Sequence, residues 1–452
     1  MTAKTAVLRS RRFLFFLPAL SWTLMYTLPL SHTPDLVALA AANPHQFPCL
    51  LQSAGAQGWD ILAAFPDSVR HYGQAEAGQL HADLAALPVG DGLADGALPF
   101  RGGWFFYLGY ELLNQFEPSV PAPLDDDFPL GALLRIPAAI LVNRADASAW
   151  LMAERPELLD RLIACLADAP IFDPRQPKVE LIEEDPPLVF TDAVRRIQRY
   201  IREGDVFQVN VSRQWEVSLS KPYAPAEVFA ALRRANPAPF SALLHLGEHA
   251  VVSSSPERLV RVAAGWADTR PIAGTHPRSP DPAEDAALRR RLIDSSKERA
   301  EHIMLIDLER NDLGRICQPG SVEVNELMAV ASYSYVHHIE SNVRGRKRPE
   351  VSPAQVMRAL FPGGTITGCP KVRTMQIIRE LETAPRRAYT GSLGYLNHDG
   401  TLDSNILIRT FMQTGSQLRF RAGAGVVADS DPERELQETR HKARGLLRAL
   451  GQ

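Results

Sequence analysis

The chain has few cysteines for its length. Its 452 residues include four, Cys49, Cys165, Cys317 and Cys369, and no two of them have the spacing of a zinc site or of a disulfide framework. None lies in a nucleophile elbow, and none is framed as the thiol of a glutamine-hydrolysing triad. If nitrogen chemistry takes place here, the ammonia must therefore come from elsewhere. Scattered thiols also indicate a reducing compartment, and we expect the cytoplasm.

Strong charge of either sign is lacking as well. The net charge is −3 and the isoelectric point is near 6.5, so nothing favours nucleic acid as a partner. Internal repeats and low-complexity tracts are absent, which excludes solenoids and disordered tails. The remaining composition is that of an ordinary globular protein, and the length allows two or three average domains or one large one.

A convincing membrane segment is also missing. The longest apolar run, residues 13–30, follows three arginines as signal sequences do, but two prolines interrupt it and it is short for a membrane span. We expect residues 1–30 to be an N-terminal extension of doubtful role. It is a dispensable segment, the product of an upstream start codon with Met25 as the true start, or a first buried strand, and a functional signal or anchor is the minor alternative.

A glycine-rich loop at residues 361–370 leads into a predicted helix. Gly363 and Gly368 have P-loop spacing, but Cys369 and Pro370 stand where that motif needs Lys and Ser or Thr, which excludes a P-loop. Pro370 suits the first position of a helix. A glycine loop at a helix start presents free N–H groups and the positive end of the helix dipole. The loop therefore predicts either an anion site or a plain turn.

The order of elements predicts an α+β fold built as one large domain. Residues 31–168 form an N-terminal region, residues 169–187 an exposed proline-rich crossing, and residues 188–452 a region in which helices alternate with antiparallel strand pairs. This interleaving argues against a doubly wound parallel sheet. We expect residues 283–312 to be one long helix, and residues 432–450 to form a closing helix capped by the preceding aspartate.

Four glutamates occur in pairs on two predicted helices. Glu298 and Glu301 share one face of the first helix, and Glu435 and Glu438 share one face of the last. If the two faces meet, the carboxylates form an oxygen-rich pocket for a hard cation such as Mg²⁺. The ordinary alternative is two solvated helix faces.

Other polar residues are candidates for chemistry. Glu257 stands at a predicted turn, where a carboxyl with a raised pKa could protonate a leaving hydroxyl. Arg409 lies inside an apolar strand, so we expect a buried anionic partner. Lys442 follows the second glutamate pair by one helical turn, and an ion pair is its simplest role. His337 and His338 could be a metal pair or core histidines.

Nine segments of the chain resemble component I of the chorismate-utilising enzymes, a family that includes anthranilate, aminodeoxychorismate, isochorismate and salicylate synthases. The similarity covers about residue 204 to the end, with weaker agreement from about residue 45. The segments are GDVFQVNVSR (204–213), SSPERL (254–259), RPIAGT (270–275), RAEHIMLIDLERNDLGR (299–315), FPGGTITGCPKVR (361–373), GSLGYL (391–396), ILIRT (406–410), AGAGVVADSDPE (422–433) and QETRHKA (437–443).

This resemblance implies an α+β sandwich with a cleft between two sheets, and it implies a role for each matching residue. Glu301 and Glu438 would hold Mg²⁺ against the ring carboxylate of chorismate, with Glu298 and Glu435 as neighbours. Glu257 would be the general acid that expels the C4 hydroxyl, and His338 would lie near that hydroxyl. The residues that would bind the substrate carboxylates are Tyr395, Arg409 and Lys442, together with Thr365 and the backbone of Gly423 and Gly425.

Gln208 narrows the reaction that the resemblance implies. Family members that use water carry a lysine at this position, and a glutamine marks those that use ammonia. The similar enzymes obtain ammonia from a glutaminase subunit, which we expect as the partner here. Amination at C2 with loss of pyruvate gives anthranilate, and amination at C4 gives aminodeoxychorismate.

Two sets of residues disagree about the position of amination. Residues 236–242, Gln52 and residues 364–368 resemble the aminodeoxychorismate branch. Ala273, in contrast, stands where many enzymes of that branch carry a lysine that attacks C2, and the same position is alanine in anthranilate synthases. A methyl group cannot attack carbon. We expect C4 amination from the larger set and keep the anthranilate reaction as the alternative.

Overall fold

The fold contains two large antiparallel sheets. The structure is a computed structural model that describes residues 11–13, 25–55, 57–90, 98–332 and 336–452. Within these residues, the first sheet has 13 strands. In spatial order they are β1 (Arg11–Phe13), β2 (Met25–Leu30), β9 (Ala149–Ala153), β8 (Ala138–Asn143), β4 (Trp59–Ala64), β3 (Cys49–Gln52), β12 (Phe240–Leu246), β13 (His249–Ser255), β22 (Thr410–Thr414), β23 (Gln417–Val426), β11 (Gln208–Leu219) and β10 (Val179–Glu184), with β19 (Gly368–Cys369) paired to β11.

The second sheet has ten strands among the described residues. They run in the order β16 (Ile272–Pro277), β18 (Val336–Arg346), β15 (Trp266–Thr269), β14 (Arg258–Ala263), β21 (Leu402–Asn405), β20 (Ser392–Asn397), β6 (Gly103–Leu108), β7 (Gly131–Ile136) and β5 (Ser68–Tyr72), with β17 (Glu323–Ser332) on β18. The α-helices are α1 (Leu36–Ala42), α2 (Ala77–Ala85), α3 (Leu113–Phe116), α4 (Pro156–Ala167), α5 (Pro187–Arg202), α6 (Pro225–Ala235), α7 (Pro282–Asp294), α8 (Ser296–Gly314), α9 (Pro353–Leu360), α10 (Lys371–Leu381) and α11 (Pro432–Ala449).

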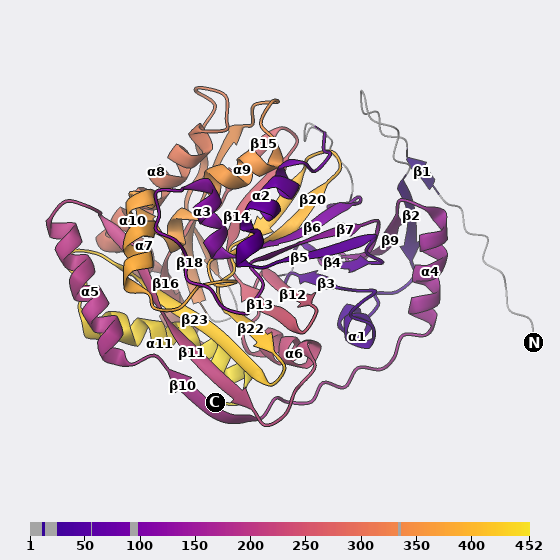
Figure 1. Ribbon diagram of the computed structural model, residues 1–452, viewed down its shortest axis with the longest axis horizontal. Coiled ribbons are helices and arrows are strands. Elements are labelled where there is room, and N and C mark those ends of the chain that lie inside the picture. Colours follow the sequence, from indigo (N-terminus) through magenta and orange to yellow (C-terminus); the bar gives the residue numbers. More distant parts are fainter. Residues whose placement is uncertain (1–10, 14–24, 56, 91–97, 333–335) are drawn as a thin grey trace, which may run out of the picture.

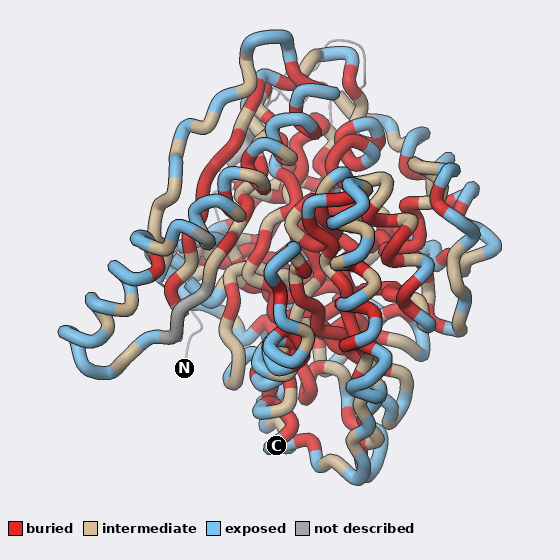
Figure 2. The backbone as a smooth tube through the Cα atoms, turned by 90° about the vertical axis from the view of Figure 1, so that its left-hand side faces the viewer, coloured by how far each residue is buried: buried red, intermediate tan, exposed pale blue. Residues whose placement is uncertain are grey.

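The two sheets pack face to face, and helices cover their outer faces. Apolar side chains of both sheets, such as Leu244 and Val251 from the first and Phe105 and Leu134 from the second, form one core between them. A second core lies under α1, α4, α6 and α11 on the first sheet, and a third lies under α2, α9 and α10. Figure 1 shows α5, α11 and α6 along the first sheet, and Figure 2 shows buried backbone in the interior with exposed segments around the outside. The predicted two-sheet α+β sandwich is confirmed.

Part of the N-terminal extension is a strand, which is one of the alternatives given for residues 1–30. Met25–Leu30 form β2, and residues 26–30 pair with β9 of the first sheet. Residues 1–10 and 14–24 lie outside the described residues. No helix in the described part of the chain is long and apolar enough to cross a membrane.

Two predicted segments differ from the structure: one predicted helix is divided in two, and the proline-rich crossing contains a strand. The long helix expected at residues 283–312 is two helices, because Ser295 has extended backbone and its hydroxyl accepts a hydrogen bond from Glu298 N–H as an N-cap. The proline-rich crossing contains the edge strand β10, whose acidic composition gave no strand signal. The closing helix was predicted correctly: α11 starts at Pro432, and the Asp431 carboxylate accepts from the N–H of Arg434.

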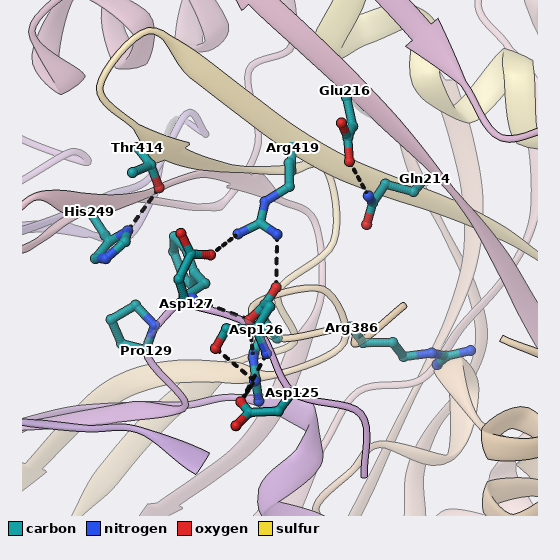
Figure 3. Close-up of polar contacts among 12 residues, drawn as sticks. Asp125, Asp126, Asp127, Pro129, Gln214, Glu216, His249, Arg386, Thr414 and Arg419 are labelled. Carbon is teal, nitrogen blue, oxygen red and sulfur yellow. Dashed lines mark hydrogen bonds and ion pairs between the residues drawn. The ribbon is translucent and has the colours of Figure 1, made fainter. Parts of the chain in front are cut away.

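Three consecutive aspartates tie the N-terminal region to the C-terminal half (Figure 3). The guanidinium of Arg387 is fully buried and pairs with Asp125 and with Asp126, whose Oδ1 lies 2.6 Å from Nε. Asp126 also accepts from Arg419 at 2.8 Å, and the exposed Asp127 accepts from Arg419 at 3.2 Å. One loop therefore neutralises two cations, of which Arg387 has no access to water.

Removing the Asp126 carboxylate should destabilise the fold far more than removing its neighbour. Asp126→Ala leaves the buried Arg387 with an incomplete set of partners, and we expect a loss of about 3 kcal/mol in the free energy of unfolding. Asp127→Ala removes only an exposed ion pair and should cost under about 1 kcal/mol. Urea titration followed by tryptophan fluorescence measures both values, and equal losses would contradict this account of the cluster.

Candidate active site

The floor of the candidate site is formed by β11 and β23. The first residue of β11, Gln208, is buried, and its side-chain amide donates to Glu301 Oε1 of α8 at 2.8 Å. Gly425 of β23 lies opposite, and a Cβ there would come within 2.5 Å of the Gln208 amide nitrogen and 3.7 Å of Glu301 Oε1. The lack of a side chain at Gly425 therefore allows an amide and a carboxylate to meet above the strand.

The carboxylates of α8 and α11 come together at this floor. Burial raises the pKa of Glu301, and the charges of Glu298 and Glu438 raise it further, against the hydrogen bond from Gln208. Glu438 accepts from Lys442 at 2.7 Å, and Lys442 also donates to the carbonyl of Gly423 at 2.9 Å. The two predicted glutamate faces thus meet, and their mutual repulsion is what a hard cation would relieve.

The fourth glutamate, Glu435, is buried one turn before Glu438 on α11. In the described residues, no three acidic, histidine or cysteine side chains already stand at metal-binding distance from one another. The four glutamates supply the carboxylate oxygens that Mg²⁺ prefers. They would have to draw inward around such an ion.

Glu257 stands at the turn between β13 and β14, as predicted. The carboxyl is buried, and burial raises its pKa from 4.5 to about 8, against the hydrogen bond from Thr365, whose hydroxyl donates to Oε1 at 2.6 Å. Its backbone is fixed as well, because its carbonyl accepts from Ile406 N–H at 3.0 Å. A carboxyl that holds its proton at neutral pH in a fixed position has the properties of a general acid.

Arg409 has a different backbone conformation from the one predicted, but carboxylates act on its guanidinium as expected. It precedes β22 instead of lying inside a strand, and its φ of 54° is in the left-handed region that non-glycine residues rarely adopt. The electrostatic neighbours of its guanidinium are Tyr389, Glu438 and Glu257. The expected buried anionic surroundings are therefore present, and the strained turn directs a cation to the acid and to the glutamate cluster.

Ala273 and His338 lie at the opposite wall, on β16 and β18. His338 Nδ1–H donates to the carbonyl of Gly274 at 3.2 Å, and burial lowers the pKa of His338, which favours the neutral ring. A Cβ on Gly274 would lie 2.8 Å from Glu298, so this wall adjoins the carboxylates. His337 contacts Asp285 at 2.9 Å. Of the two roles considered for the histidine pair, metal ligands or core residues, His337 therefore has that of a core histidine.

Tyr395 was predicted to bind substrate, and the structure places it elsewhere. Its ring packs on Phe100 and Phe105, with centroid distances of 5.8 and 6.1 Å, and it lines a separate cavity of about 500 Å³ with Arg258 and Asp403. The motif around it gave no indication of which end or face of β20 it occupies. The structure therefore does not bring Tyr395 to the site described above.

Tyr389 is the tyrosine that the sequence reasoning missed. A Cβ on Gly423 would lie 2.7 Å from the Tyr389 hydroxyl, and the charge of Arg409 acts on this hydroxyl. The left-handed backbone of Thr390 (φ 62°) and of Arg387 (φ 50°) around it is not visible in the sequence pattern. Eight of the predicted residues are linked to one another by hydrogen bonds or electrostatic interactions: Gln208, Glu301, Glu438, Lys442, Gly423, Arg409, Glu257 and Thr365.

Comparisons with known proteins agree with this geometry. A model of chorismate binding enzymes matches residues 46–448. The chain is 41% identical to an anthranilate synthase component I-like protein of Synechocystis over 78% of this chain and 73% of that protein. It is also 41% identical to aminodeoxychorismate synthase component 1 of Bacillus subtilis, over 78% and 77% of the two chains. The structure of anthranilate synthase component I from Streptococcus pneumoniae superimposes with a TM-score of 0.75 at 29% identity, over 88% of this chain and 93% of that one.

Proposed function

This chain belongs to the family of chorismate binding enzymes, and from that premise we propose that it is component I of an aminodeoxychorismate synthase, which aminates chorismate at C4. The product would be 4-amino-4-deoxychorismate, the precursor of p-aminobenzoate and folate. Relatives named aminodeoxychorismate synthase component 1 and anthranilate synthase component 1 match it about equally well, so the choice between the two reactions depends on residues of this chain.

Amination in either position is supported by one contact, the hydrogen bond from Gln208 to Glu301. A side-chain amide does not take a proton from water at neutral pH, so Gln208 does not convert water to hydroxide. It is suited to a nucleophile that needs no base to remove a proton before it attacks, such as ammonia. The chain has no recognisable glutaminase thiol, and the component 1 names of its relatives imply a second component, so a glutaminase subunit is the proposed source of ammonia.

The residues of the site divide the remaining work. Mg²⁺, held by Glu301 and Glu438 with Glu298 and Glu435 beside them, would neutralise the ring carboxylate of the substrate. Lys442 and Arg409 are placed to bind carboxylates. The nitrogen forms its bond to carbon and gives up one proton, while Glu257 gives its proton to the departing C4 hydroxyl, which leaves as water. Glu257 is then reprotonated for the next turnover.

The choice of C4 is supported by residues around the separate cavity. Gln52 donates to Asp60 at 3.0 Å and accepts from Arg233 at 2.7 Å, so both ends of its amide bind the chain itself. Gln52 and residues 236–242 are the segments that resemble the aminodeoxychorismate branch. The anthranilate reaction is the second candidate, because Ala273 offers no nucleophile beside the carboxylates.

Product analysis distinguishes the two candidates. We expect purified protein with chorismate, MgCl₂ and ammonium chloride to form a product that keeps the enolpyruvyl group and that an added lyase converts to p-aminobenzoate. Glutamine in place of ammonium should give no product without the partner. Anthranilate with pyruvate, detected by fluorescence and mass spectrometry, would overturn the C4 assignment and make Ala273 the decisive residue.

A further inference from the structure

The second half of α8 contacts the loop that carries Thr365. Glu309 is buried, and its interactions with the Gly364 backbone and the Thr269 side chain lower the pKa of its carboxyl, against the effect of burial. Glu309 Oε1 is close enough that a Cβ on Gly364 would lie 3.3 Å away. Gly364, the residue just before Thr365, is therefore in direct contact with α8.

A second attachment joins both ends of the same loop. Lys371, the first residue of α10, forms an ion pair with Asp312 of α8, and the two side chains are 11% and 5% exposed. The same ammonium donates to the carbonyl of Leu360, the last residue of α9, at 3.3 Å. One buried cation thus binds the residues that enter and leave residues 361–370, and fixes both to α8.

These buried charges have no part in the chemistry described above, yet they are costly to bury. Removing a lysine and carboxylates from water has a large free-energy cost, and hydrophobic residues of similar volume often stabilise a fold equally well or better. The loop that they hold does take part. It supplies the Thr365 hydroxyl to Glu257 at 2.6 Å, and its strand β19 pairs with Gln208 and Val209 of β11.

We propose that Glu309 and the Asp312–Lys371 pair are positioning residues that hold Thr365 against the general acid Glu257. This inference rests on the acid role proposed for Glu257. Glu301 precedes Glu309 by eight residues on the same helix, about 12 Å along its axis. The cation ligands and the support of the acid therefore belong to one rigid element, which keeps the distance between them constant.

The pKa of Glu309 gives this arrangement a second effect. Burial and the charge of Asp312 raise the pKa of Glu309, and the charge of Glu309 in turn raises the pKa of Glu257. Glu309→Gln should then lower the pKa of Glu257 and move the alkaline limb of the kcat profile to lower pH. The charged groups that act on Glu257 are Glu309, Glu340, Lys442 and Arg409.

A double-mutant cycle tests the pathway through Thr365. Chorismate consumption is followed, because it is common to both candidate reactions. We expect Lys371→Met and Thr365→Val each to lower kcat about tenfold with little change in KM, and the double variant to be no slower than the slower single. A double variant slowed by the product of the two factors would overturn the proposal. Lys178→Met, at an exposed lysine, is the matched control.

Two further comparisons keep the test decisive. Asp312→Asn combined with Lys371→Met removes both charges, in case the unpaired carboxylate prevents folding. Asp307→Asn, in an exposed ion pair with Arg310 on the same helix, is the control for Glu309→Gln and should leave kcat and its pH profile unchanged. A pH profile of Glu309→Gln identical to that of the unmodified enzyme would contradict the role of Glu309.

Backbone exchange gives a result that does not depend on turnover. In hydrogen–deuterium exchange of the full chain without substrate, Lys371→Met should speed exchange in residues 361–370 at least about tenfold, whereas Lys178→Met should not. Unchanged exchange would overturn the positioning role even if chorismate is aminated. Faster exchange in a protein that does not consume chorismate would instead reject the proposed function and leave the attachment of the loop confirmed.

Discussion

Replacing Glu257 by glutamine should lower kcat for chorismate conversion about 1000-fold. Glutamine has nearly the same shape and can still accept the hydrogen bond from Thr365, but it has no acidic proton to give to the leaving hydroxyl. KM for chorismate should change little, because the lost interaction develops only in the transition state. Initial rates of chorismate loss, measured with saturating Mg²⁺ and ammonium, give both constants.

A matched substitution separates this effect from a general loss of charge. Glu350 is a largely exposed carboxylate paired with Arg348, and Glu350→Gln should leave the rate unchanged. Retention of more than about a tenth of the activity by Glu257→Gln would assign the proton donor to another group, because general acid catalysis contributes at least about 100-fold.

The pH dependence follows from the same carboxyl. The acid is active in its protonated form, so kcat should fall as the pH rises through the pKa of Glu257 at about 8. The sign for stability is the same. The pKa of Glu257 is 4.5 in the unfolded chain and about 8 in the fold. Between these two pH values the folded protein binds one more proton than the unfolded chain. The free energy of unfolding should therefore decrease as the pH rises across that window. Glu257→Gln should remove both dependences.

The sequence predicted the parts of the site that depend on local spacing. Glutamates three residues apart on a helix must share a face, and a proline after an aspartate marks a helix start, so α11 and the carboxylate cluster could be expected without a structure. Glu257 was expected at a turn for the same reason, because its neighbours are a proline and the ends of two strands. The two-sheet fold itself came from the family resemblance.

The errors come from features that local spacing does not determine. Tyr395 was named from the family resemblance and Tyr389 was not considered, because the position of a side chain relative to the cleft depends on strand register and on left-handed residues such as Thr390. The break at Ser295 lies in a continuous helical pattern, where a single cap overrides the periodicity. The role of α8 as the support of the Thr365 loop depends on contacts such as that between Lys371 and Asp312, which are 59 residues apart, and no local pattern indicates such a contact.

Replacing Glu301 by glutamine should raise the Mg²⁺ concentration for half-maximal activity at least about 100-fold. Loss of a group that only orients a ligand costs 10–100-fold in metal affinity, and loss of a ligand itself should cost no less. The amide keeps a polar group beside Gln208, so the floor of the site should remain intact. Rates measured over a range of MgCl₂ at constant ionic strength give the apparent affinity.

The control for Glu301→Gln belongs to the partner helix. Glu433 lies in the exposed first turn of α11, and Glu433→Gln removes a carboxylate near Glu435 without changing the cluster, so Mg²⁺ dependence should be unaltered. Glu438→Gln should reproduce the effect of Glu301→Gln, because both carboxylates are proposed cation ligands and the charge of Glu438 acts on Glu301. An unchanged Mg²⁺ dependence in Glu301→Gln would place the cation elsewhere, and the raised pKa of Glu301 would then reflect only its burial among like charges.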